Sequence, residues 1–174
     1  MTHATEKSSI LPVARVSRDT LQERVYFQLT ELILTGEIAP GQLVKIQELA
    51  EAFGVSAMPV REALKRLTAA KALTVVSGRS IGIPPLNAER LEDLRRVRLE
   101  VETIAADWAA ANIDAKDTEA LKAQLAQMEE AIASGNVKQY LRANYAFHFI
   151  IYHAAQSESL LAIIENLWLQ ISPY

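Results

Sequence analysis

Two cations and their neighbours recur at helical spacing near residue 60. Met58, Arg61, Lys65 and Thr68 are separated by three or four residues, so a helix would place them along one side. An arginine fork can donate to guanine O6 and N7, and a short helix that presents Arg and Lys has the size to enter the DNA major groove. Charges at this spacing alone more often form a solvated helix face. The flanking sequence decides between these two interpretations.

The stretch LVKIQELAEAFGVSAMPVREALKRL, residues 43–67, predicts two short helices joined by a tight turn. The first helix would end at Gly54, which can adopt a positive φ. The second would begin at Ser56, whose hydroxyl can cap the first amides, and Pro59 is tolerated in a first turn. The inward stripe of the second helix would comprise Val60, Ala63, Leu64 and Leu67. The face that carries the two cations is left free.

The hydrophobic period changes after this helix. Residues 73–83 contain two β-prone runs, LTVV and SIGI, around Ser77-Gly78-Arg79, which predicts a small hairpin. A hairpin directly after a DNA-reading helix is the wing of a winged helix, and Arg79 near its tip could reach a phosphate or the minor groove. Upstream, residues 18–35 predict a helix that stops at Gly36. Residues 18–83 are therefore expected to form a winged helix-turn-helix domain.

The rest of the chain is predicted to be helical. Pro84-Pro85 indicates a stiff linker over residues 84–86, and residues 1–17 show no sustained period and predict a flexible tail. Residues 87–174 predict four helices: a long one that begins at Asn87, a second from near Asp114 or Asp117 to Gly135, a third over about 136–155 and a fourth over about 157–171. The first would be capped by Asn87 and would pack through Leu94, Val97, Val101, Ile104 and Trp108. The expected fold class is mainly α: an N-terminal winged helix-turn-helix with a small β-hairpin wing, followed by an all-α helical-bundle domain.

Charge is divided unevenly along the chain. The net charge is -3, with +2 in residues 1–83 and -5 in residues 84–174. A basic element carried by an acidic body suits phosphate contact at one end. The chain has no cysteine, which excludes a disulfide framework and thiolate metal sites. Because it also lacks an apolar run of membrane-spanning length and a secretion signal at its start, we expect a cytoplasmic protein without membrane partners.

Taken together, these residues resemble the GntR family of bacterial transcriptional regulators. The resemblance rests on Pro40-Gly41, on Phe53-Gly54-Val55-Ser56, on Pro59-Val60-Arg61-Glu62-Ala63-Leu64 and on the hairpin, and it covers residues 20–172. The helical remainder resembles the FCD domain of the FadR-like subgroup. The resemblance implies a homodimeric regulator, a repressor by expectation, that binds a palindromic operator in double-stranded DNA. It further implies a response to a small metabolite, commonly a carboxylate, and no enzymatic activity.

The resemblance also implies which residues contact DNA. Carried over position by position, the contacts fall at Lys45, Gln47, Ser56, Ala57, Met58 and Arg61 and, in the wing, at Gly78 and Arg79. Lys65 joins them from its place on the free face. Ala57 stands where many relatives have a basic or polar residue, so the operator is expected to differ. Ala72 replaces the glycine before the wing, and Ser80 replaces the second residue of the usual Arg-Gly pair.

In this subgroup the helical domain often binds a divalent metal such as Zn or Ni through an Asp and three His. The positions of the first Asp and His hold Asn144 and His148 here. Helical spacing alone places both on an inward stripe, where they need partners, so a hydrogen-bonded pair and a metal site are both open. A neutral amide is a weaker ligand than a carboxylate. The helices that would bring two further His are not in this chain, and we expect an incomplete domain.

Arg98 and Glu102 lie one turn apart, where the family often shows an Arg and a Glu. On a helix surface such a pair contributes about 0.3 kcal/mol. Alternatively, Arg98 faces a cavity and holds a carboxylate effector through two parallel hydrogen bonds. The candidate effector-binding residues are therefore Arg98, Asn144 and His148.

Two other functions remain open from the sequence. The chain could be a DNA-binding dimerisation module with a non-functional pocket, which would act without an effector. It could also be a metal-dependent enzyme built around His148, but the chain has only His3 and His153 besides, which is a poor supply of ligands. On a helix His153 is turned about 140° away from His148, so it is not expected to be a co-ligand.

Overall fold

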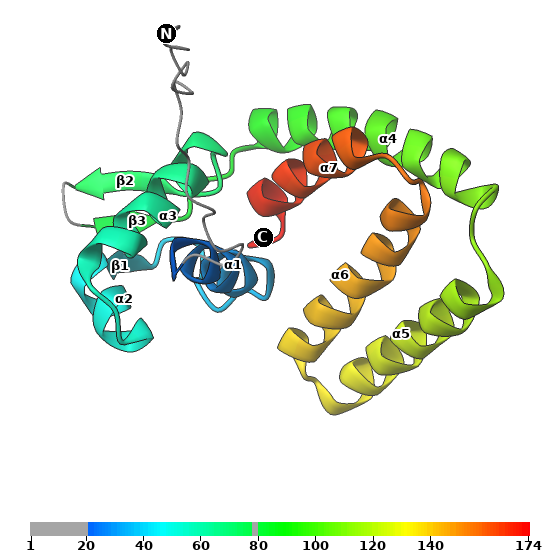
Figure 1. Cartoon of the computed structure of the whole chain (residues 1–174), viewed down its shortest axis with the longest axis horizontal. Helices are drawn as coiled ribbons and strands as arrows, with labels where there is room; N and C mark the ends of the chain where they lie inside the picture. Colours follow the sequence, from blue (N-terminus) through cyan, green and yellow to red (C-terminus); the bar gives the residue numbers. More distant parts are fainter. Residues whose placement is uncertain (1–20, 78–79) are drawn as a thin grey trace, which may run out of the picture.

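The computed structural model describes residues 21–77 and 80–174. The chain forms two domains in sequence order, a winged helix and a set of four long helices (Figure 1). The winged helix contains α1 (Leu21–Leu34), β1 (Leu43–Lys45), α2 (Ile46–Phe53), α3 (Ala57–Ala69), β2 (Thr74–Ser77) and β3 (Ser80–Gly82). The helical domain contains α4 (Ala88–Ala110), α5 (Ala115–Ser134), α6 (Val137–Ala154) and α7 (Glu158–Ile171). The predicted fold class is confirmed. The predicted tail, residues 1–17, and the first residues of the predicted helix 18–35 lie outside the described residues.

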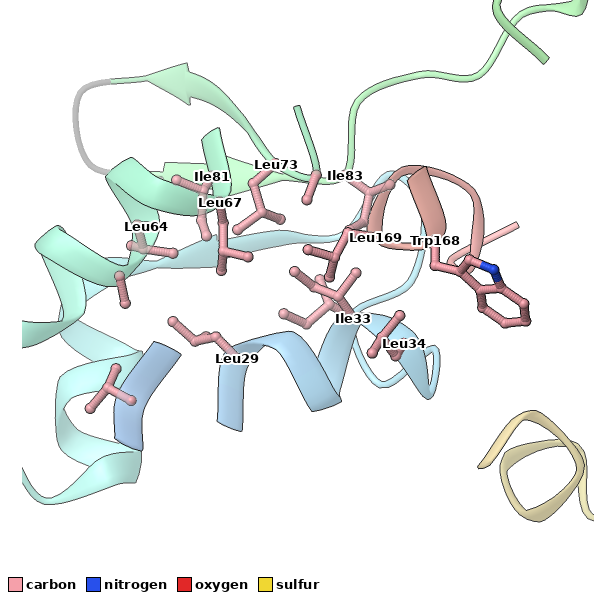
Figure 2. Packing of buried hydrophobic residues seen from close by; sticks show 14 of the residues in the cluster. Leu29, Ile33, Leu34, Leu64, Leu67, Leu73, Ile81, Ile83, Trp168 and Leu169 are labelled. Atoms are coloured by element: carbon pink, nitrogen blue, oxygen red, sulfur yellow. The ribbon is translucent and has the colours of Figure 1, made fainter. Parts of the chain in front are cut away.

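The core of the winged helix forms where α1 packs on α3. Leu29 of α1 and Val60 and Leu67 of α3 are completely buried, with Ala63 and Leu64 of the same stripe almost so. Leu73 and Ile81 close this core from the side of the sheet (Figure 2). The predicted inward stripe of α3 is therefore confirmed, and its packing fixes which face of α3 points outward.

The sheet has one strand more than the sequence predicted. Its order is β1-β3-β2, with both pairs antiparallel, and Val44 and Val75 both lie opposite Ile81. The prediction that the stretch from Leu43 belongs to a helix was wrong for Leu43–Lys45, because the free edge of β3 offers backbone partners that sequence periodicity does not reveal. The end of β3 lies close to the residue that precedes β1, since a Cβ atom added to Gly82 would lie 3.0 Å from the carbonyl oxygen of Gln42.

Each long helix of the second domain begins at a capping side chain. Asn87 Oδ1 accepts from the backbone N–H of Arg90 at 2.8 Å, as predicted, and Asp114 caps α5 in the same way. α5 and α6 form an antiparallel pair, while α4 lies along one edge of the domain and packs on α6 and α7 (Figure 1). Among residues 21–77 and 80–174, no helix combines the length and apolar character that crossing a membrane requires.

The predicted packing seam of α4 was wrong for three of its five residues. Leu94 is buried, but Val97, Ile104 and Trp108 are 42, 41 and 47% exposed. The buried side is completed instead by Ala105 and Ala109, which are fully buried. Small side chains allow a neighbouring helix to approach closely, so the seam rotates toward them and leaves the larger residues outside.

The two domains share a buried contact between α7 and α1. Leu169 of α7 is 5% exposed and belongs to the same core as Ile33 and Leu34 of α1. Figure 2 shows Leu169 beside Ile33, whereas the indole of the adjacent Trp168 points away from the winged helix. Lys138 Nζ also pairs with Glu37 at 2.6 Å across the domains. The helical domain therefore rests directly on the winged helix.

Candidate nucleic-acid interface and effector pocket

The turn between α2 and α3 sets the direction of α3. Gly54 has a φ of 65°, and the backbone N–H of Val55 donates to the carbonyl of Ala50 at 3.0 Å, which closes α2. Ser56 is the N-cap residue with extended backbone, but its side chain makes no capping hydrogen bond, contrary to the prediction. Ser56 is exposed, so water can satisfy the first amides of α3 instead.

The outward face of α3 carries the residues that the spacing singled out. Met58 is 61% exposed, Arg61 and Lys65 are exposed, and Thr68 is half-buried. Lys65 Nζ pairs with Glu62 Oε1 at 2.6 Å, a contact that is open to solvent. Exposed pairs of this kind contribute at most about 1 kcal/mol, so the ammonium can exchange Glu62 for a phosphate.

A hollow of about 290 Å³ joins this face to the wing. Its lining includes Arg61, Lys65 and Thr68 of α3 together with Ser77 and Ser80 of the hairpin. The structure thus brings the base-reading candidates next to the two serines that flank the hairpin tip. The predicted wing residues Gly78 and Arg79 lie outside the described residues.

Lys45 and Gln47 lie at the start of α2, where both are exposed. Lys45 Nζ donates to Glu48 Oε1 at 2.9 Å. This hydrogen bond raises the pKa of Lys45 and lowers that of Glu48. Gln47 Nε2 donates more weakly to Glu51 at 3.5 Å. Both side chains therefore remain on the surface, with local partners that an anion could replace.

A further cation of α3 is held by a contact within the winged helix. The guanidinium of Arg66 lies over the ring of Tyr26 at 3.7 Å and so holds α3 on α1. Sequence reasoning missed Val75 and Val76, which are 58 and 55% exposed on β2. The alternation of a half-buried strand would have predicted only one of these two valines outside.

The second site surrounds the carboxylate of Glu102 in the helical domain. Arg98 Nε donates to Glu102 Oε1 at 2.5 Å, and Trp168 Nε1 donates to the same oxygen at 3.2 Å. Tyr152 OH donates to Glu102 Oε2 at 2.9 Å. The side chains of Arg98 and Glu102 are only 24 and 20% exposed. The pair is therefore not a simple surface ion pair, because donors from α6 and α7 also converge on it.

His148 reaches this network through Tyr152. Its Nδ1 lies 3.3 Å from the Tyr152 oxygen, whose single proton is already donated to Glu102, so Nδ1 must carry the proton and donate. Burial lowers the pKa of His148 below its ordinary value of 6.5; the charge of Glu102 opposes that shift and the charge of Arg98 adds to it. Burial, followed by the charge of Glu102, raises the pKa of Tyr152.

A hydrogen-bonded pair of Asn144 and His148, one of the two alternatives that the sequence left open, is not what the structure shows. Both side chains are half-buried on α6, but among the described residues no hydrogen bond joins them. Val137, seven residues before Asn144 on the same helix, is 68% exposed because α6 begins there at the end of the domain. His153 is exposed and is therefore not part of this site.

The residues present do not fit a divalent metal. Within residues 21–77 and 80–174, no three His, Cys, Asp or Glu side chains come together in an arrangement that could hold an ion. Asn144 offers a neutral amide oxygen, which is a weaker ligand than a carboxylate, and the Nδ1 of His148 donates to Tyr152, which leaves only Nε2 of that ring for a metal. The donor set at this position supports hydrogen bonding rather than metal binding.

Comparison with known proteins assigns both halves of the chain. The profile of bacterial regulatory proteins of the gntR family matches residues 21–83, and the FCD domain profile matches residues 93–174. The HTH-type transcriptional regulator McbR of Escherichia coli K12 is 31% identical over 154 residues, which are 88% of this chain and 70% of McbR. The solved structure of E. coli McbR/YncC matches with a TM-score of 0.84 over 89% of this chain and 73% of that one.

One further relative and one further solved structure match most of the chain. The gluconate operon transcriptional repressor of Bacillus licheniformis is 28% identical over 162 residues, 92% of this chain and 66% of the repressor. A GntR regulator structure from Rhodococcus sp. RHA1, at 18% identity and a TM-score of 0.66, shares the fold over 87% of this chain and 72% of its own. This chain belongs to the GntR family of bacterial transcriptional regulators, and its second half is an FCD domain.

Proposed function

We propose that the protein binds a palindromic operator in double-stranded DNA as a homodimer, represses transcription from the cytoplasm, and responds to a small carboxylate taken up by its helical domain. The observation that carries this proposal is the outward face of α3. Its buried stripe fixes Arg61 and Lys65 on the opposite side, exposed and adjacent to the wing. This is the placement that major-groove reading by a helix-turn-helix requires.

Within this interface we assign distinct roles to the two cations. Arg61 is suited to a two-bond contact with guanine, since its guanidinium carries no ion pair that would hold it on α3 in the described part of the chain. Lys65 and Lys45 are suited to phosphates, which they would take in exchange for Glu62 and Glu48. Met58, Gln47 and Ser56 complete the proposed contact surface, with Gly78 and Arg79 proposed for the wing.

The test is a selection of bound duplexes from a random DNA pool at one salt concentration. The unmodified protein, Arg61→Ala and Arg96→Ala are run in parallel. Arg96 is exposed on α4, so its replacement removes the same charge from the helical domain. We expect the unmodified protein and Arg96→Ala to enrich one palindrome and Arg61→Ala to lose it. Equal enrichment by all three would contradict base reading by Arg61, and no enrichment by any would contradict the proposal.

A dimer is supported by the apolar face that α4 leaves uncovered. Val97, Ile104 and Trp108 are separated by seven and four residues, so they lie on one side of the helix, and each is more than 40% exposed. Contiguous exposed apolar residues mark interaction surfaces, and tryptophan is enriched at the centres of interfaces. A two-fold pair of subunits would also match a palindrome, whose half-sites lie about 34 Å apart along DNA.

The carboxylate response is supported by the chemistry around Arg98. A hollow of about 270 Å³ beside it is lined by Arg95 and Arg98 and by the aliphatic side chains of Leu91, Leu99 and Ile171. Guanidinium groups beside an aliphatic wall suit a small organic acid. One relative is named as the repressor of a gluconate operon, and gluconate is a carboxylate. His148 and Asn144 on α6 are proposed to act with Arg98, His148 through Tyr152.

A second function, DNA binding without any effector, is favoured by one specific observation. Arg98 already has a carboxylate partner in Glu102, with which it forms a partly buried pair. A panel of small carboxylates added to the operator complex distinguishes the two functions. A change in operator affinity with at least one acid supports the regulated form, whereas unchanged affinity throughout the panel supports the effector-independent form.

A further inference from the structure

The carboxylate of Glu102 is held as a bound ligand would be held. Three donors from three different helices converge on it: the Arg98 guanidinium of α4, the Tyr152 hydroxyl of α6 and the Trp168 indole of α7. The distances lie between 2.5 and 3.2 Å, and both carboxylate oxygens are engaged. A charge-assisted contact and two neutral donors at one carboxylate form an anion cradle that selects the planar shape of this group.

The cradle opens onto the hollow beside α4. Arg98 and Glu102 both line the hollow, so a molecule in it would lie directly against the pair. The second arginine of the hollow is occupied in the same manner, because Arg95 donates twice to Glu92 at 2.7 Å. Each guanidinium of this wall is therefore neutralised by a carboxylate of its own helix.

We propose that Glu102 is an internal competitor for the effector, so that a small monocarboxylate binds by displacing the Glu102 side chain from Arg98, Tyr152 and Trp168. This inference rests on the proposed carboxylate response and specifies its site and regulation. The two carboxylates compete because the Arg98 Nε–H and the Trp168 Nε1–H, each a single donor, are both directed at Glu102 Oε1. The effector gains only the difference between its own contacts and those of Glu102, which makes the response require a high concentration of acid.

Displacement of the Glu102 side chain would act on the DNA-binding domain through α7. Glu102 ties α4 to α7 through Trp168, and the next residue, Leu169, lies in the core with Ile33 and Leu34 of α1 (Figure 2). Adjacent residues on a helix point in different directions, so α7 presents one side to the cradle and another to the winged helix. Releasing Trp168 from Glu102 therefore loosens the helix on which the contact between the domains depends.

The experiment removes the Glu102 carboxylate and supplies acetate in its place. The purified full chain carrying Glu102→Ala is melted in sodium acetate and in sodium chloride of equal ionic strength. Loss of a half-buried partner of Arg98 should lower the melting midpoint by about 5 °C, and acetate should restore at least half of that loss. Acetate should have no such effect on the unmodified protein or on Glu92→Ala, which removes the carboxylate partner of the more exposed Arg95.

Two further variants keep the test decisive. In the double variant Arg98→Ala/Glu102→Ala, acetate should no longer restore the midpoint, because the cation that holds it is gone. If Glu102→Ala does not fold, Glu102→Gln keeps the shape of the side chain and leaves Arg98 uncompensated. Quenching of Trp168 fluorescence by acetate is then measured in a Trp108→Phe background. The proposal would be overturned if acetate affected Glu102→Ala and Glu102→Gln no more than it affects the protein that keeps Glu102.

This test uses neither DNA nor the natural effector, so its outcome is separate from that of the proposed function. Rescue by acetate together with failure to enrich any operator would leave the cradle intact as a binding site and remove its regulatory role. Enrichment of an operator without acetate rescue would leave the DNA-binding function and remove Glu102 as a competitor.

Discussion

Replacing Leu169 by Ala tests whether α7 holds the helical domain on the winged helix. Leu169 is 5% exposed, so the change removes about three buried methylene equivalents, worth about 2.4 kcal/mol at about 0.8 kcal/mol each. The cavity left behind adds to this loss, because the neighbouring side chains relax only in part. We expect the free energy of unfolding to fall by about 3 kcal/mol and the melting midpoint by about 9 °C.

The ion pairs between the domains, Lys138–Glu37 and Arg142–Glu31, are too exposed to replace this contact. The Lys138–Glu37 pair has side chains 58 and 31% exposed, and such pairs contribute about 0 to 1 kcal/mol. The measurement is urea unfolding followed by circular dichroism, with Ile163→Ala as the matched control. Ile163 is on the same helix but 50% exposed, so its replacement should cost less than about 1 kcal/mol. Equal losses of unfolding free energy in the two variants would refute the inference that Leu169 makes the main contact between the domains.

Three further predictions concern charge and assembly. Lys65→Ala should weaken binding to every duplex alike and should lower the slope of log affinity against log salt by about 1. Salt titrations measure this slope, and a loss of affinity that depends on DNA sequence would contradict a phosphate role for Lys65. Trp108→Asp should lower the molar mass found by light scattering to that of a monomer, whereas Ile163→Asp should not; a dimer in both variants would place the interface elsewhere. Burial lowers the pKa of His148, so the unfolded state binds a proton more readily and the stability present above pH 6.5 is lost as the pH falls below it. Melting curves of His148→Gln should lack this acid loss and those of His153→Gln should keep it, and identical pH profiles would contradict the assignment.

Local signals in the sequence predicted most of the helices. Gly54 and Gly135 end α2 and α5 with φ near 65°, as glycines in these positions do, and Asn87 caps α4. The stripe of α3 was readable because its spacing is regular and its packing partner, α1, is near in sequence. These features need no knowledge of distant contacts.

What the sequence could not predict depends on residues far apart in the chain. The strand Leu43–Lys45 exists because β3 pairs with it, and the seam of α4 turned toward Ala105 and Ala109 rather than toward the larger residues. Hydrophobic periodicity identifies the large apolar residues of a helix, whereas the side that packs depends on how closely the neighbouring helix can approach.

The effector site shows the same limit. Arg98 and Glu102 were identified as a pair one turn apart, but the donors Tyr152 and Trp168 lie 50 and 66 residues from Glu102 in sequence. The sequence left His148 either paired with Asn144, one turn away, or in a metal site, while the structure supplies Tyr152 as its partner. Helical spacing can identify which residues share a face, but not which of them meets a side chain from another helix.

The most direct test of base reading by α3 is the specificity ratio of the Arg61→Ala protein. Affinities for the selected palindrome and for a scrambled duplex are measured by fluorescence anisotropy at one salt concentration, with Arg96→Ala as the control. Loss of a two-bond base contact costs about 1 to 3 kcal/mol, so Arg61→Ala should lower the ratio about 5- to 150-fold and Arg96→Ala should leave it unchanged. An unchanged ratio in Arg61→Ala would contradict the reading of DNA sequence by this face.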